Sequence, residues 1–193
     1  MPFARPKKRE PVGEPELFEY AIGVLSRRMR TVRELKRLMS ARAFPGEQGE
    51  RDMDAVVTRL VDLKYLSDTR FAADYTRMRK ENQGFGRRRV QQDLAQKGIA
   101  KEISETTLAA AFDDSDEVAL ARQYCERKRI KQPSGPNAQK ETVRVMNRLM
   151  RAGFSSNAIF KVLRMWDLPE DAVAGIEEGG ADSDSYARQN DDE

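Results

Sequence analysis

The chain has 193 residues, of which 35% are charged and 7% aromatic, and its 35 basic and 32 acidic residues give a formal net charge of +3. It has no histidine and one cysteine, Cys125, which excludes His-based catalytic triads, most zinc sites and an internal disulfide. No run of about 18 apolar residues is present, and the N-terminus lacks the apolar core of a secretory signal. The composition predicts a helical, soluble, cytoplasmic protein.

The charge is distributed unevenly. Residues 168–193 hold nine acidic residues and one basic residue, a net charge of −8, whereas the other residues carry +11. A basic body predicts a polyanionic partner, but a charged helical surface with a solubilising tail explains the counts equally well. We expect residues 168–193 to form a disordered acidic tail. It either competes with the partner for the basic surface or serves solubility alone.

Prolines divide the rest of the chain. Four of the eight lie in the first fifteen residues and predict a flexible basic arm over residues 1–15, and the others fall between apolar-periodic segments. The apolar positions recur at helical spacing, and no segment alternates like a strand. The nine predicted helices carry their apolar stripes, read as core, at residues 17–25, 35–39, 56–63, 71–78, 90–94, 103–112, 118–125, 143–150 and 159–166.

Capping patterns mark several helix ends. Ser67 and Ser155 precede apolar stripes as N-caps, and capping boxes are predicted for Thr31 with Glu34 and for Asp114 with Glu117. Glycine is the preferred residue for a left-handed helix end. Such ends are predicted at Gly98 and Gly153.

A short pattern recurs along the chain. The hexapeptides LAQKGI (residues 94–99) and LMRAGF (residues 149–154) share a leucine, a glycine and a large apolar residue, and LMSARAF (residues 38–44) is a degenerate copy with Arg42 at the glycine position. The spacing of about 55 residues accommodates three helices per unit. The sequence therefore predicts an all-α fold of three tandem three-helix repeats, over residues 16–66, 67–113 and 114–167, in an elongated, curved array.

The stretch QGFGRRRV (residues 83–90) raises the question of a phosphate-binding loop. Arg89 stands where a G-x-G-x-x-G loop needs its third glycine, no strand precedes it, and no Walker G-K-[ST] follows. We expect Gly84 and Gly86 to reverse the chain between two helices. The arginines after them would fan out from a helix start toward an anion, with the backbone N–H groups pointing the same way.

Similar basic clusters recur in the third repeat, which favours one basic surface over an ordinary solvated face for each cluster. The candidate residues for contact with a polyanionic partner are Arg77, Arg79, Lys80, Arg87, Arg88, Arg89, Lys97, Arg127, Lys128, Arg129, Arg144, Arg148 and Arg151.

The stretch LKYLSDTRFAADYTRMRKENQGFGRRRVQQDLAQKGI (residues 63–99) resembles the RecX family of bacterial recombination regulators, and the resemblance extends over residues 16–166. Lys64 replaces the family's glycine, Ser67 an aspartate and Asp93 a glutamate. The matching positions are Tyr65, Leu66, Asp68, Arg70, Phe71, Ala72, Gly86, Arg89, Val90, Leu94, Lys97, Gly98 and Ile99. Nine of these are read as structural motif positions: Tyr65, Leu66, Asp68, Phe71, Ala72, Gly86, Leu94, Gly98 and Ile99.

The resemblance implies three tandem three-helix repeats and a monomeric, non-enzymatic modulator of RecA in DNA repair, homologous recombination and the SOS response. Such a protein lies in the groove of the RecA–DNA filament and usually limits filament growth, ATPase, strand exchange and coprotease activity. Some relatives also bind single- or double-stranded DNA. No cofactor, metal or membrane is implied. The alternative is a helical DNA-binding or nucleoid-type protein that acts without RecA. A magnesium-dependent nuclease would need a carboxylate cluster that the sequence lacks.

Overall fold

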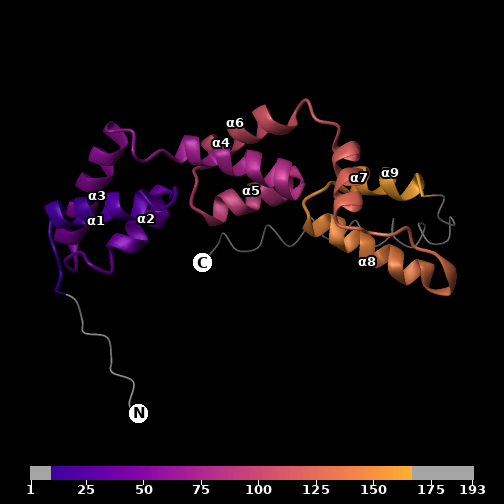
Figure 1. Ribbon diagram of the computed structural model, residues 1–193, viewed down its shortest axis with the longest axis horizontal. Helices are drawn as coiled ribbons and strands as arrows, with labels where there is room; N and C mark the ends of the chain where they lie inside the picture. Colours follow the sequence, from indigo (N-terminus) through magenta and orange to yellow (C-terminus); the bar gives the residue numbers. More distant parts are fainter. Residues whose placement is uncertain (1–9, 167–193) are drawn as a thin grey trace, which may run out of the picture. The chain divides into compact units, whose positions relative to one another are not determined.

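The structure, a computed structural model, describes residues 10–166. Most of the predicted arm and the whole predicted acidic tail lie outside the described residues. Within residues 10–166 there is no strand, only an isolated bridge between Val12 and Ala43. The helices (Figure 1) are α1 (Glu14–Leu25), α2 (Val32–Met39), α3 (Glu47–Asp62), α4 (Asp68–Met78), α5 (Arg87–Gln96), α6 (Lys101–Phe112), α7 (Glu117–Arg127), α8 (Ala138–Arg151) and α9 (Ser156–Arg164), with a π-helical turn η1 (Arg79–Gln83) and a 3₁₀ turn η2 (Gly135–Asn137). The all-α prediction is confirmed.

The described residues form two compact units. Unit 1 comprises residues 10–77 and 91–111, and unit 2 comprises residues 78–90 and 112–166. The chain passes between the units within α4, α5 and α6, so neither unit is a contiguous stretch of sequence. The division into repeats at residues 66/67 and 113/114 stays a prediction.

In unit 1, α1, α2 and α3 enclose an apolar core. The side chains of Leu17, Leu35, Met39 and Leu60 are fully buried in it. Thr31 caps α2, because its Oγ1 accepts a hydrogen bond of 3.1 Å from the N–H of Glu34. The predicted cap is thereby confirmed. The apolar stripes of these helices are also confirmed except at Leu63, which was predicted as core at the end of α3 and is 50% exposed.

In unit 2, the core lies between α7, α8 and α9. The rings of Tyr124 and Phe154 meet edge to face at 5.7 Å, and Phe85 packs against the same cluster. Cys125 is 3% exposed, and burial raises the pKa of its thiol to about 11. The thiol is therefore protonated at neutral pH and unreactive, as expected of a small buried apolar group.

The capping box predicted for Asp114 and Glu117 is wrong. Asp116 is the N-cap of α7, because its Oδ1 accepts from the N–H groups of Val118 and Ala119 at 2.9 and 3.2 Å. The carboxylate of Glu117 instead accepts from the backbone N–H and hydroxyl of Ser155 at 2.7 and 2.6 Å. A tertiary partner thus takes the side chain that the local pattern assigned to the helix start.

The stripe predicted as the core face of α8 is also wrong in part. Val143 and Met150 are 38% and 42% exposed, whereas Val145 and Leu149 are buried. Both sets follow helical spacing, so the periodicity of α8 admits two apolar faces. Packing against α9 selects the second set and leaves the first on the surface.

Four helix ends share one left-handed turn. The residue after the C-cap has a positive φ at Lys64 (60°), Gly98 (79°), Arg129 (50°) and Gly153 (92°). In each turn the next N–H donates back five residues, as from Ile99 to Leu94 O and from Phe154 to Leu149 O. The predicted stops at Gly98 and Gly153 are confirmed. The degenerate copy has no such turn, because Arg42 has no positive φ.

Candidate interaction surface

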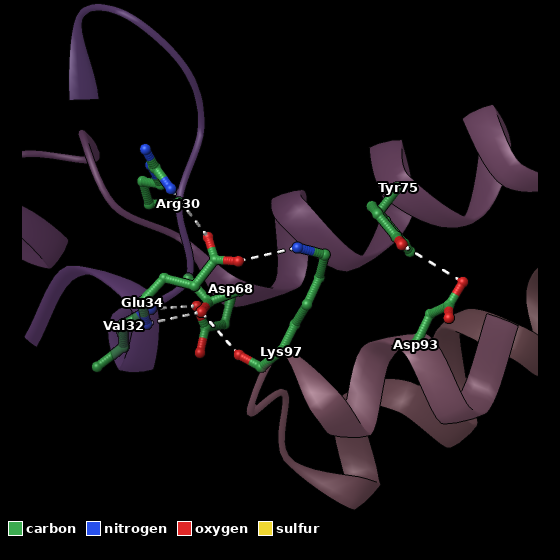
Figure 2. A network of polar contacts seen from close by, with 8 residues as sticks. Arg30, Val32, Glu34, Asp68, Tyr75, Asp93 and Lys97 are labelled. Carbon is green, nitrogen blue, oxygen red and sulfur yellow. Dashed lines mark hydrogen bonds and ion pairs between the residues drawn. The ribbon is translucent and has the colours of Figure 1, made fainter. Parts of the chain in front are cut away.

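In unit 1, the start of α2 docks on the turn between α5 and α6 through side chains. Figure 2 shows the polar contacts of this region, in which Lys97 pairs with Glu34 and Val32 bonds to Asp68. The Thr31 hydroxyl donates to Lys97 O at 2.8 Å, and Lys97 Nζ donates to Glu34 Oε1 at 2.8 Å. The N–H of Val32 donates to Asp68 Oδ1 at 2.9 Å. We call this contact junction 1.

Lys97 is the centre of junction 1. Its ammonium lies 5.4 and 5.2 Å from the ring centroids of Phe71 and Tyr75, which stack on each other, and its side chain is 27% exposed. An ammonium over two aromatic faces gains cation–π attraction in addition to its ion pair with Glu34. The structure therefore places this predicted contact residue within unit 1, where it holds two segments together.

The two carboxylates of junction 1 respond to burial differently. Burial alone would raise the pKa of Glu34, but the hydrogen bond and charge of Lys97, the charge of Arg30 and the N–H of Thr31 together lower it. Burial raises the pKa of Asp68 despite the hydrogen bond from Val32, and the charge of Glu34 raises it further. Junction 1 is therefore sensitive to pH through two groups with shifts of opposite sign.

In unit 2, the start of α5 docks on the turn between α8 and α9 through backbone groups. The N–H of Gly86 donates to Ala152 O at 2.8 Å, and the N–H of Arg88 donates to Gly153 O at 3.3 Å. A methyl carbon on Gly86 would lie 2.6 Å from Gly153 C, so only glycine allows this approach. We call this contact junction 2.

Junction 2 overturns two expectations about the arginine stretch. Gly86 serves close approach and not chain reversal, whereas Gly84, with φ of 71°, ends the π-helical turn. Two N–H groups near the start of α5 are bonded to carbonyls of the α8–α9 turn. Those two N–H groups are thus not directed at an anion, because the chain itself supplies the acceptors.

Most of the predicted contact residues have partners within their own unit. The arginines do fan out: Arg87 pairs with Asp113, Arg88 is exposed, and Arg89 is half-buried. The other partnered residues are Arg77 with Asp74, Arg79 with Gln83, Lys80 with Ser115, Arg127 with the carbonyl of Glu81, and Lys128 over the ring of Tyr124.

The predicted residues on α8 differ from these. Arg144, Arg148 and Arg151 are exposed, and across residues 10–166 the structure records no ion pair for them. Lys140 extends the row by one more turn, since it lies four residues before Arg144 and is also exposed. At about 100° per residue these four cations fall within an arc of about 80°, and the row is roughly 16 Å long. The i, i+4 spacing could have revealed Lys140 from the sequence.

A neutral strip lies beside this row. Val143, Asn147 and Met150 fall within about 60° of one another on the helix and directly adjoin the cations. All three are exposed. We call the two strips together the α8 face. It combines a line of unpaired positive charge with exposed apolar side chains.

The family-motif positions are mainly interior. Leu66, Ala72 and Leu94 are at most 1% exposed, and Phe71 and Ile99 are nearly buried. Tyr65 differs, because its side chain is 63% exposed and only its N–H, which donates to Leu60 O, closes the turn after α3. Asp68 accepts in junction 1, Gly86 belongs to junction 2, and Gly98 supplies a left-handed turn.

Two further features bear on the kind of protein. Within residues 10–166, no three histidine, cysteine, aspartate or glutamate side chains gather where they could hold a metal ion. Among the same residues, no helix has the length and apolar character needed to cross a membrane.

Comparisons with known proteins identify the family. The family model for the second three-helix domain of RecX matches residues 67–108. Regulatory protein RecX of Escherichia coli strain K12 is 30% identical over 155 residues, which cover 77% of this chain and 90% of that protein. The chain belongs to the RecX family. Regulatory protein RecX of Mycobacterium ulcerans is 29% identical over 161 residues, covering 83% of this chain and 90% of that protein.

The fold comparison agrees with this assignment. The crystal structure of RecX from Lactobacillus salivarius matches with a TM-score of 0.61 at 23% identity, over 81% of this chain and 97% of that chain. At this identity the match shows the shared RecX fold. The resemblance found in the sequence is confirmed.

Proposed function

We propose that this RecX-family chain is a non-catalytic regulator of RecA, which binds in the groove of the RecA–DNA filament. There it limits filament growth, ATPase, strand exchange and coprotease activity, in the cytoplasm and as a monomer. Membership of a family whose relatives are named regulatory proteins supports the proposal. The observation that carries its site is the α8 face, where exposed cations are left for an external anion.

The α8 face suits an extended polyanion. Its four cations lie along roughly 16 Å of helix, which matches about five nucleotides of one B-DNA strand at 3.4 Å each. Acidic RecA side chains are the other anion within reach of such a row. Arginine serves either partner, because its planar donor fork binds phosphate and carboxylate bidentately.

The test compares RecA-dependent ATPase and strand exchange with and without the chain. The variant replaces Arg144, Arg148 and Arg151 by glutamine, and it should require at least about tenfold more protein for the same inhibition if three partly desolvated contacts are lost. Unchanged inhibition by this variant would remove the α8 face from the proposal. No effect of the wild-type chain on RecA would remove the proposal itself.

A matched control removes the same charge elsewhere. Arg27, Arg28 and Arg37 are exposed arginines of unit 1, and within residues 10–166 the structure records no ion pair for them. Their replacement by glutamine should leave inhibition near the wild-type level. Equal loss in both variants would mean that net charge alone governs binding.

The second candidate is a DNA-binding protein that acts without RecA. It is favoured by the same unpaired cations, which would contact phosphates. About four neutralised phosphates predict that log affinity for duplex DNA falls with log salt at a slope of about −3 to −4, with little sequence preference. DNA binding at physiological salt without any effect on RecA would support this candidate over the first.

A further inference from the structure

The exposed strip of Val143 and Met150 does not belong to the apolar core that the described residues of unit 2 form. Its members are 38% and 42% exposed, although Met146 beside them packs partly against the unit 2 core. Exposed apolar side chains bordered by a charged row are the composition of a protein-binding surface. A nucleic-acid phosphate would use the cations and leave the apolar strip uncovered.

The chain itself holds a segment with the complementary composition. Residues 168–178 carry three large apolar residues and four carboxylates within eleven positions, and they are Leu168, Val173 and Ile176 with Glu170, Asp171, Glu177 and Glu178. The α8 face offers an apolar strip and four cations along a helix of 14 residues, which is similar in number of residues to the segment. The match extends to both charge and apolar character.

The starting point of this segment lies within reach of α8. The Trp166 carbonyl accepts a hydrogen bond from Gln132 Nε2. Gln132 precedes Ala138, the first residue of α8, by six residues. Six residues span at most about 20 Å, and the 27 residues after Trp166 can extend far beyond that distance. No long linker is needed to bring residues 168–178 onto the α8 face.

We propose that residues 168–178 dock on the α8 face of their own chain and cover it until an external polyanion displaces them. Val173 and Ile176 contact the strip of Val143 and Met150, and the carboxylates face the row from Lys140 to Arg151. The inhibitory role of residues 168–178 rests on the proposed function of the α8 face. The contact itself requires neither RecA nor DNA.

The contact can be measured on the full chain by paramagnetic labelling. The Gly179→Cys variant carries a spin label just beyond the docking segment, and Cys125 remains unlabelled because it is buried with its thiol pKa at about 11. The amide signals of Val143, Asn147 and Met150 should broaden, and those of α3 should not. Broadening that is absent from α8, or equal over all exposed basic helices, overturns the proposal.

Two variants distinguish specific docking of residues 168–178 from non-specific electrostatic attraction. Val173→Ser with Ile176→Ser keeps every charge and should abolish the broadening on α8. The control Asp191→Asn with Asp192→Asn and Glu193→Gln removes three charges outside the segment and should preserve it. Loss in the control with retention in the serine variant would reduce the contact to unspecific charge attraction and overturn the proposal.

Two further measurements test whether a second copy of the chain occupies the α8 face and whether the docked segment inhibits binding. In the first measurement, spin-labelled chain without isotopes is mixed with isotope-labelled chain that carries no spin label. Broadening on α8 would then assign the face to a second copy and overturn the proposal. In the absence of such transfer, the serine variant should bind a single-stranded oligonucleotide about threefold to tenfold more tightly at low salt, with the advantage lost at high salt. Equal affinities with an intact contact would exclude an inhibitory role and leave the RecA assay to decide the proposed function separately.

Discussion

Junction 1 and junction 2 perform the same task with different chemistry. In each, a helix start docks on a later helix turn 66 residues along the chain, through Thr31 and Lys97 in one and Gly86 and Ala152 in the other. Junction 1 uses a hydroxyl, an ion pair and the half-buried carboxylate of Asp68, whereas junction 2 uses backbone contacts that glycine permits. The same docking of a helix start on a later turn is thus reached through polar side chains in unit 1 and through close backbone approach in unit 2.

The largest effect is expected from the equivalent glycines. A methyl carbon on Gly153 would lie 2.6 Å from Arg89 Cβ and closer still to its backbone nitrogen, at a φ of 92°. Gly153→Ala should cost about 3 kcal/mol from overpacking and left-handed strain together. Urea unfolding followed by the fluorescence of Trp166, the single tryptophan, reports on unit 2.

Gly98→Ala in junction 1 should cost less, about 2 kcal/mol, because its nearest neighbours are side-chain atoms of Arg33 and not backbone. Adding Arg33→Ala should recover part of the loss, whereas the backbone clash at Gly153 has no such remedy. Gly135→Ala, at a φ of 75° in open space, isolates the strain. Equal costs at all three glycines would refute the distinction between the junctions.

The next effect concerns the ion pair of junction 1. Lys97→Met keeps the apolar stem but leaves Glu34, whose side chain is 18% exposed, without its nearest cation. We expect a loss of about 1–2 kcal/mol. A double-mutant cycle with Glu34→Gln, measured by circular dichroism in urea, should give a coupling of about 1 kcal/mol. A coupling near zero would mean that packing of the stem, and not charge, holds the junction.

Acid should weaken junction 1 and spare junction 2. The pKa of Glu34 in the folded chain is lowered below its ordinary value of 4.5, so its stabilisation is present above that pH and lost as pH falls through the folded value. Asp68 opposes this trend, because its raised pKa favours the folded chain as it takes up a proton. The stability difference between wild type and Glu34→Gln should therefore shrink below pH 4.5. The cost of Gly153→Ala should stay constant over the same range.

The smallest effect is a gain at a turn that neither junction uses. Lys64 has a φ of 60°, which is strained for any residue with a Cβ. Lys64→Gly should stabilise unit 1 by about 0.5–1 kcal/mol, after the greater entropy of unfolded glycine is deducted. The thermal midpoint measures it, and Arg129→Gly, at the matching turn after α7 with a φ of 50°, should give a similar gain in unit 2. A loss in either variant would show that the side chain has contacts worth more than the strain.

The amino-acid sequence by itself determined the number, type and approximate ends of the helices. Apolar periodicity, prolines between segments and caps such as Thr31, Ser155 and Gly98 are local signals, and local hydrogen bonds and backbone sterics decide helix ends. The match over residues 63–99 also indicated the RecX family, which the comparisons confirm. These features depend on neighbours within a few residues, so a linear pattern contains them.

Only the tertiary structure decided which side chains were available for a partner. Lys97 and Arg87 read as free cations in the sequence, but carboxylates distant along the chain, Glu34 and Asp113, pair with them. Glu117 left its predicted cap for Ser155, and α8 buried the other of its two apolar stripes. Charge pairing and burial depend on residues far apart in sequence. Helical periodicity depends only on near neighbours and therefore cannot predict either of them. The α8 face consists of residues of α8 that are neither buried in the core nor paired with a carboxylate among the described residues.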